Sequence, residues 1–175
     1  MTTQVVTPLN SPNNNANFVT IGRGERMWET QQLPIKASVA MVSGTALCVE
    51  VSASNPTGYL TAMATTNANG QNFAGILQET IATTDADYAT AGKLKFVEVP
   101  LTPYAEAEFS VGSGTLGAND VGRIAQFYTD SKSIAVDTNG AGVEITGVIV
   151  TSANATTAIP ARGICRFSVP RVTTA

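Results

Sequence analysis

The sequence contains no histidine, only two cysteines, and few charged or aromatic side chains, which make up 13% and 6% of its 175 residues. Without histidine, neither a Ser–His–Asp nor a Cys–His catalytic arrangement can form, and histidine-containing zinc sites are excluded. Two cysteines are too few for a zinc site of four thiolates. The chain also has no G-x-x-x-x-G-K-[ST] loop and no G-x-G-x-x-G after a strand. We therefore expect no enzymatic activity, no cofactor and no bound metal.

Charge and hydropathy argue against two further classes of partner. The net charge is −3 and there is no basic run, so we expect no nucleic acid as a partner. No apolar stretch approaches the roughly 20 residues of a membrane-spanning helix, so we expect no membrane partner either. The start, MTTQVVTPLNSP, lacks the charged and apolar regions of a secretory signal. Cys48 and Cys165 are interpreted as buried thiols of a chain made in a reducing compartment, since no spacing supports a disulfide.

The residues that are abundant favour β-strands. Thr and Val suit pleated, half-buried surfaces, and Gly with Asn marks turns, whereas no window shows a helical apolar period. In residues 44–52, Leu47, Val49 and Val51 alternate with Cys48 and Glu50. A period of two is what an antiparallel sheet with one solvated face requires. The sequence predicts an all-β fold, an antiparallel β-barrel or sandwich.

A second stretch shows the same alternation. Val143, Ile145 and Ile149 share one face of a strand predicted over residues 143–150. Directly before it stands Asn139-Gly140, the dipeptide that most strongly indicates a two-residue hairpin turn. We therefore expect a hairpin whose second strand begins near residue 143.

Two phrases of the sequence are nearly the same. GKLKFVEVP spans residues 92–100, and GICRFSVP spans residues 163–170. The match extends backwards to a Gly followed by aliphatic residues, Gly75 in the first copy and Gly147 in the second. Further upstream, GTALCVEVS and GRIAQFYTD correspond loosely. This similarity predicts two half-repeats that cover one another's apolar faces, each a strand, a loop, a strand, an Ala/Thr-rich loop and a strand.

These observations give a domain organisation. The half-repeats cover about residues 44–100 and 122–170 within a β domain of residues 36–175. A connection rich in Gly and Ser, residues 106–120, joins them. Residues 1–35 hold an Asn-rich stretch with two prolines and no apolar period, and are predicted to form an extended N-terminal arm.

The first closing phrase differs from the second by one residue. Leu94 and Phe96 alternate with lysines, but Val97 then breaks the phase before Glu98 and Val99. One inserted residue in a strand is the sequence trace of a β-bulge. We therefore predict a bulge at Phe96–Val97.

Several acidic residues could in principle carry chemistry. Asp85 and Asp87 could offer carboxylates to Ca²⁺, but further oxygen ligands are missing nearby, so a solvated turn is preferred. Asp137 faintly resembles part of a calcium loop, although a hairpin turn explains it more simply. Glu106 and Glu108 would share one face of a strand, where nothing apolar separates their pKa values, and are interpreted as an exposed face.

The arm contains the one cluster that combines charge with aromatic side chains. Trp and Arg are enriched at binding hot spots. Phe18, Arg23, Arg26 and Trp28 are therefore the candidate partner-binding residues, which would anchor the arm along a neighbouring subunit. The alternative for Trp28, the single tryptophan, is that it caps one end of the barrel.

The chain resembles the decoration (cement) proteins of tailed-bacteriophage heads and other small β-rich virion proteins. The similarity is carried by FAGIL at 73–77, ATAGKLKFVEVP at 89–100, VGRIAQFYTDSKSIAVDTNG at 121–140 and ITGVIV at 145–150. It implies a non-enzymatic protein that binds the major capsid protein lattice from outside, commonly as a homotrimer, and stabilises the capsid. It also implies a place on the virion surface and synthesis in the bacterial host cytoplasm.

Three other functions remain open from the sequence. A tail-tube subunit would need a long loop or hairpin that reaches its neighbour, which residues 101–120 could supply. A head fibre would suit the long arm. A carbohydrate-binding or adhesin module would require aromatic side chains exposed on one face, but the few aromatic residues are scattered along the chain.

Overall fold

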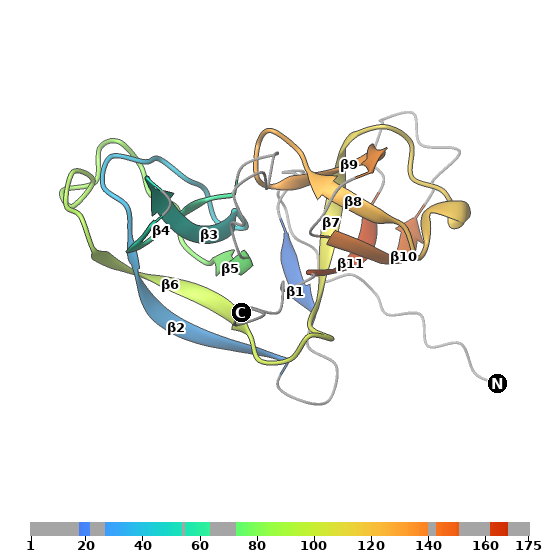
Figure 1. Ribbon diagram of the computed structural model, residues 1–175, viewed down its shortest axis with the longest axis horizontal. Helices are drawn as coiled ribbons and strands as arrows, with labels where there is room; N and C mark the ends of the chain where they lie inside the picture. Colours follow the sequence, from blue (N-terminus) through green and yellow to red (C-terminus); the bar gives the residue numbers. More distant parts are fainter. Residues whose placement is uncertain are drawn as a thin grey trace.

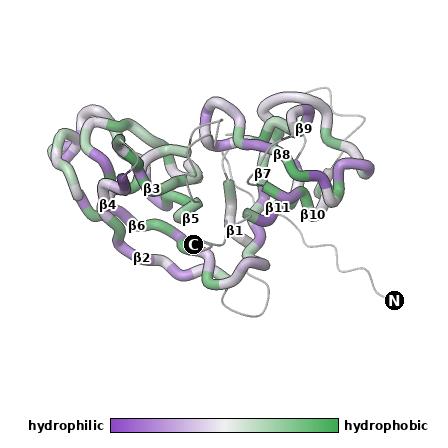
Figure 2. Tube along the Cα trace, viewed as in Figure 1, coloured by the Kyte–Doolittle hydropathy of each residue, from purple (hydrophilic) through white to green (hydrophobic). Residues whose placement is uncertain are grey.

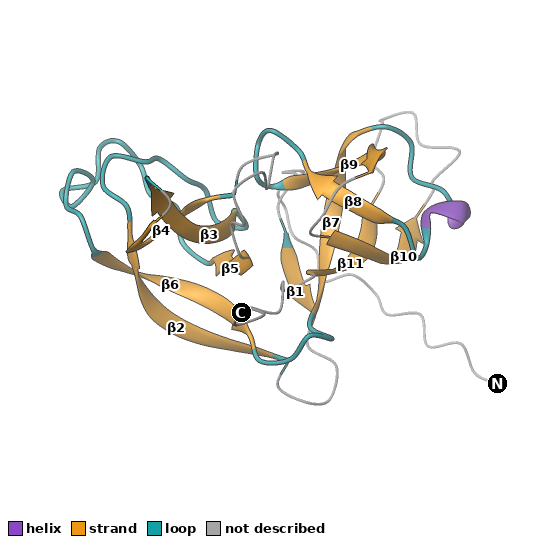
Figure 3. Ribbon diagram, viewed as in Figure 1, coloured by secondary structure: helices purple, strands orange, loops and turns teal. Residues whose placement is uncertain are grey.

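The computed structural model describes residues 18–21, 27–53, 55–63, 73–139, 143–150 and 162–167. The predicted all-β fold is confirmed: the described residues form strands and one short 3₁₀ helix, η1 (Ala118–Asp120) (Figure 3). The strands are β1 (Val19–Ile21), β2 (Trp28–Ile35), β3 (Ala46–Ser52), β4 (Asn55–Ala62), β5 (Phe73–Leu77), β6 (Lys93–Pro100), β7 (Glu106–Ser113), β8 (Ile124–Phe127), β9 (Ser133–Asn139), β10 (Val143–Val150) and β11 (Arg162–Phe167).

The strands form two closed rings that lie side by side (Figure 1). In the first ring, barrel one, the order is β2-β4-β3-β5-β6. The second ring, barrel two, belongs to a six-stranded sheet in the order β1-β7-β11-β10-β8-β9, and a further pairing of β7 with β9 closes strands β7 to β11. Strand β1 lies between the barrels and is added to the edge of β7.

The two barrels have the same topology. Replacing β2 to β6 by β7 to β11, in order, reproduces every pairing of the ring. The correspondence includes the single parallel pair, which is β2 with β4 in barrel one and β7 with β9 in barrel two. All other pairs are antiparallel. The repeated unit thus has five strands, and the two similar closing phrases occupy the equivalent strands β6 and β11.

Two segments that the sequence placed outside the half-repeats are strands of the barrels. Residues 28–35, assigned to the arm, form β2 and pair with β6 along its whole length. Residues 106–113, assigned to the connection, form β7 of barrel two. Both strands contain polar residues that are exposed or half-buried. In Figure 2, β2 is mostly pale and purple, whereas β5 is green. Long-range pairing rather than local pattern makes such segments strands, so periodicity alone did not reveal them.

Two predictions of local structure are wrong. No bulge occurs at Phe96–Val97, because β6 pairs with β2 residue by residue from Lys93 to Pro100. The hairpin predicted at Asn139-Gly140 is not one either, since β9 and β10 each pair with β8, which lies between them. Gly140 itself lies outside the described residues.

The core has two parts. The smaller part fills barrel one and consists of Ile35, Met41, Leu47, Leu60, Leu77, Ile81 and Val97. The larger part fills barrel two and continues into the contact between the barrels, where Ala46, Cys48, Met63, Phe73 and Ile76 of barrel one join it. The first three residues of β3, Ala46–Cys48, are therefore buried on both faces of the strand. Cys48 is buried, as predicted, although the face of β3 that it shares with Glu50 was interpreted as the solvated one; at Cys48 this face packs against barrel two.

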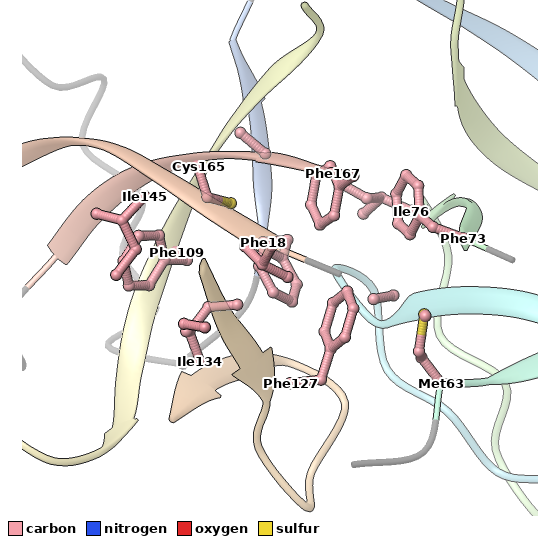
Figure 4. Close-up of a cluster of buried hydrophobic side chains, with 14 of the residues drawn as sticks. Phe18, Met63, Phe73, Ile76, Phe109, Phe127, Ile134, Ile145, Cys165 and Phe167 are labelled. Carbon is pink, nitrogen blue, oxygen red and sulfur yellow. The ribbon is translucent and has the colours of Figure 1, made fainter. Parts of the chain in front are cut away.

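Aromatic rings fill the contact between the barrels (Figure 4). Phe73 of β5 stacks on Phe167 of β11, with 3.9 Å between centroids and 6° between planes. Phe127 of β8 stacks against Phe167 at 6.0 Å, and Phe18 meets Phe167 edge-on at 5.4 Å. Rings in these arrangements attract one another beyond the gain from burial alone. Five of the eleven aromatic residues, which are far apart in the sequence, thus gather at one interface.

Hydrogen bonds also join the barrels. The indole nitrogen of Trp28 donates to the Glu106 carbonyl oxygen at 3.0 Å. The turn between β8 and β9 docks on barrel one, where the Ser131 carbonyl accepts the Ala46 N–H at 2.9 Å and the Ser131 hydroxyl donates to the Met63 carbonyl. These bonds satisfy polar groups that the contact buries, and they fix how one barrel sits on the other.

Candidate interaction surface

The structure describes two of the four candidate partner-binding residues, Phe18 and Trp28. Phe18 is buried, with 3% of its surface exposed, and belongs to the core between the barrels. Trp28 is half-buried against the same core, edge-on to Phe73 and Phe167. Both aromatic side chains hold the fold together in this structure, as the alternative interpretation of Trp28 supposed. Arg23 and Arg26 lie outside the described residues.

The acidic candidates are each engaged within the protein. The Asp85 carboxylate accepts the Ala82 N–H at 2.9 Å, as in a capped turn. Asp87 forms an ion pair with Lys95 at 3.1 Å, and Asp137 accepts the Ser113 hydroxyl at 2.9 Å. The described residues include no group of three or more His, Cys, Asp or Glu side chains that could hold a metal ion.

Glu106 and Glu108 form cross-strand ion pairs on the outside of barrel two. Glu106 pairs with Arg166 at 3.4 Å and also accepts the Thr146 hydroxyl at 3.1 Å. Glu108 pairs with Arg162 at 3.2 Å. Strands β7 and β11 thus present opposite charges that compensate one another, which suits a face in contact with water.

The equivalent outer face of barrel one is apolar and uncharged at its centre. On β6, Leu94 is 58% exposed and Phe96 is 48% exposed. Their cross-strand neighbours on β2 are Pro34 and Gln32. We call these four residues the β2–β6 face. The sequence does not reveal this face, because alternation with two lysines favours an inward orientation of Leu94 and Phe96.

Two lysines explain why Leu94 and Phe96 point outward. Lys93 is buried, and its ammonium donates to the Tyr88 carbonyl at 2.7 Å and lies over the Tyr88 ring. Lys95 pairs with Asp87 in the same connection. Because side chains alternate along a strand, Lys93, Lys95 and the buried Val97 on the inner face turn Leu94 and Phe96 outward.

The ion pair between Lys95 and Asp87 shifts the titration of both groups. The hydrogen bond from Lys95 holds the pKa of the Asp87 carboxyl below its ordinary value, and the same bond raises the pKa of Lys95. A hydrogen bond from Lys36, assisted by one from Thr57, likewise lowers the pKa of Glu50. Each pair favours the charged forms at neutral pH.

The two thiols are inert by position. Cys48 and Cys165 are both buried and are not joined by a disulfide. Burial, with a smaller effect of Glu50, raises the pKa of Cys48 to about 11. Burial also raises the pKa of Cys165 well above its ordinary value, and the nearby Glu106 adds to the shift. Neither thiol is activated as a nucleophile, since both are held as neutral thiols.

A groove of about 540 Å³ lies beside the turn between β8 and β9. Its ionisable lining residues are Asp130 and Lys132. The Asp130 carboxylate already accepts the N–H groups of Lys132 and Ser133 and the Ser133 hydroxyl within its own turn. This carboxylate therefore stabilises the turn, and the groove contains no pair of ionisable groups arranged for acid–base chemistry.

Comparison with models of protein families finds no match, and searches of curated proteins and of solved structures find none either. In the described part of the chain, no helix has the length and apolar character needed to cross a membrane. The β2–β6 face is consequently identified from the geometry of this chain alone.

Proposed function

We propose that this chain is a non-enzymatic structural protein of a phage virion, which binds the outer surface of the assembled capsid and stabilises it. Its partners are the major capsid protein lattice and further copies of itself, in a homo-oligomer for which the resemblance suggests three subunits. The protein is made in the host cytoplasm and ends on the capsid surface.

The observation that carries this proposal is the difference between two equivalent faces. Barrels one and two share one topology, so β2 with β6 corresponds to β7 with β11. The outer face of the second pair has two ion pairs. The outer face of the first pair instead exposes Leu94 and Phe96. Neighbouring exposed apolar side chains on one face indicate an interaction site more strongly than a single exposed residue such as Ile124, and the charged twin shows that the fold itself does not require them.

The overall architecture supports a role in binding to a large assembly. Two closed barrels bury their strand edges, apart from short stretches, so neither barrel depends on an added strand to complete its ring. The barrels are joined by an aromatic core and by hydrogen bonds, which fix their relative position and so present the outer faces in one arrangement. The sequence resemblance supplies the identity of the assembly.

Co-sedimentation with phage heads assembled without this protein tests the proposal. We expect saturable binding of the wild-type chain. Full burial of the exposed half of the Phe96 ring would cover about 100 Å² and contribute about 2.5 kcal/mol, so Phe96→Ser should weaken binding by up to about 70-fold. Ile124→Ser is the matched control, because Ile124 of barrel two is 42% exposed and lies outside the β2–β6 face.

Two results would contradict the proposal. One is that the wild-type chain fails to sediment with heads at micromolar concentration. The other is that Phe96→Ser and Ile124→Ser bind as tightly as the wild type, which would remove the β2–β6 face from the contact. Negative-stain images of the purified chain separate the rival functions, since a tail-tube subunit would form rings or tubes. Residues 106–113 of the loop that such a subunit would need form β7 instead.

A further inference from the structure

Strand β1 connects the two barrels in an unusual way. In sequence it precedes β2, the first strand of barrel one, but in space it pairs with β7 of barrel two. The three antiparallel pairs are Val19 with Glu108, Thr20 with Ala107 and Ile21 with Glu106. The segment is therefore bound covalently to one barrel and non-covalently to the other.

Phe18, directly before β1, anchors the segment. Its ring lies edge-on to Phe127 at 5.8 Å and to Phe167 at 5.4 Å, both from barrel two. Its backbone N–H donates to the Gly44 carbonyl of barrel one at 3.2 Å. Only 3% of Phe18 remains exposed. Figure 4 shows the ring among the other phenylalanines of this core. Many proteins bind extended peptides through an open strand edge with a pocket for a side chain beside it.

The duplication shows that β1 is an addition to the fold. Barrel one closes with five strands, and among the described residues no further strand pairs with β2 at the position that corresponds to β1 on β7. Barrel two also closes without β1, through the pairing of β7 with β9. The edge of β7 at residues 106–108 is thus formed by the barrel itself, and β1 occupies it as a ligand would.

We propose that the edge of β7 and the Phe18 pocket form a strand-binding site that accepts residues 18–21 of a second copy of this chain. The contacts are the same whether the segment comes from its own chain or from a neighbour, so the tether alone favours the closed monomer. At the high local concentration of an assembly, exchange of this strand would link neighbouring subunits. The inference does not depend on the capsid proposal.

A peptide of residues 16–22, labelled with a fluorophore, tests this site by fluorescence anisotropy. A protease site is inserted between Ile21 and Met27, and the folded chain is cut. We expect the labelled peptide to bind the cut protein saturably and to be displaced by unlabelled peptide. A Phe18→Ala peptide should bind at least tenfold more weakly, because it lacks the ring that fills the pocket. Uncut protein should bind neither peptide.

A second variant covers the case in which the cut protein unfolds. In the intact Phe18→Ala chain, the protein's own segment has lost its anchor, so the wild-type peptide should bind to it and the Phe18→Ala peptide should not. The proposal is overturned if a folded form of either protein fails to bind the wild-type peptide. It is equally overturned if the two peptides bind with the same affinity, since the pocket would then make no contribution to recognition of the Phe18 ring.

Discussion

Phe96 and Phe167 occupy matching positions in the two similar closing phrases, yet replacing them should change the free energy of unfolding by very different amounts. Phe167 is 3% exposed and packs with four aromatic residues, Phe18, Trp28, Phe73 and Phe127. Phe96 is 48% exposed, and its ring faces away from the core. The test compares the free energy of unfolding of Phe167→Ala and Phe96→Ala with that of the wild type.

The expected magnitudes follow from burial. Truncation of a buried phenylalanine costs about 3–5 kcal/mol, because the transfer free energy of the ring is lost and a cavity remains. The loss at Phe167 should lie in the upper part of this range, since several rings lose a partner. Truncation of Phe96 should change stability by less than about 1 kcal/mol. A further Phe73→Ala change should reveal a coupling of about 0.5–1.5 kcal/mol with Phe167.

Urea denaturation followed by tryptophan fluorescence measures these differences, because Trp28 contacts both Phe73 and Phe167 and reports on the junction of the barrels. Equal losses for Phe96→Ala and Phe167→Ala would refute the strand phase described for β6. A loss below about 1 kcal/mol for Phe167→Ala would refute the aromatic core between the barrels.

Three other predictions follow from single sites. Gly75→Ala should destabilise the protein by about 1–3 kcal/mol in thermal unfolding, because the new Cβ would lie 2.5 Å from the Glu98 carbonyl oxygen. Gly147→Ala, at the matching place in the second copy, should change stability by less than about 1 kcal/mol, since the nearest atom to its new Cβ would be 3.4 Å away. The stability difference between the wild type and Lys95→Met should be present from about pH 5 to 10, where both partners are charged. It should shrink as the pH falls through the lowered pKa of Asp87, and again as the pH rises through the raised pKa of Lys95. A difference in stability that is constant from pH 2 to 7 would contradict the ion pair. Neither Cys48 nor Cys165 should react with a thiol reagent at pH 8 until the protein unfolds, and rapid labelling of the native state would show that one of them is accessible.

Strand character and the direction of alternation could be predicted from the sequence where a strand has one buried face. Val143 and Ile145 are buried, and Glu144 between them is half-exposed, as their alternation indicates. The phrases beginning at Gly75 and Gly147 fall on the equivalent strand pairs, β5 with β6 and β10 with β11. Short-range pattern is enough in these segments, because each inner face meets the core of its own barrel.

The remaining features depend on contacts between distant segments. The inner lysines of β6 are held by groups in the connection before it, Lys93 by the Tyr88 carbonyl and Lys95 by the Asp87 carboxylate, which no alternation rule anticipates, and this led to the incorrect bulge at Phe96–Val97. Asn139-Gly140 looked like a hairpin turn, but β8 lies between the strands on either side of it. Cys48 is buried on the supposedly solvated face of β3 because a second barrel packs there. The positions of these lysines also explain why the sequence does not reveal the β2–β6 face.

Electron cryomicroscopy of phage heads incubated with the purified chain tests the central claim most directly. The account predicts additional density on the outside of the shell at symmetric lattice positions, in which each subunit has two lobes. The lobe that corresponds to barrel one should contact the shell through Leu94 and Phe96. Heads without additional density, or two-lobed density whose contact with the shell leaves the β2–β6 face exposed to solvent, would contradict the account.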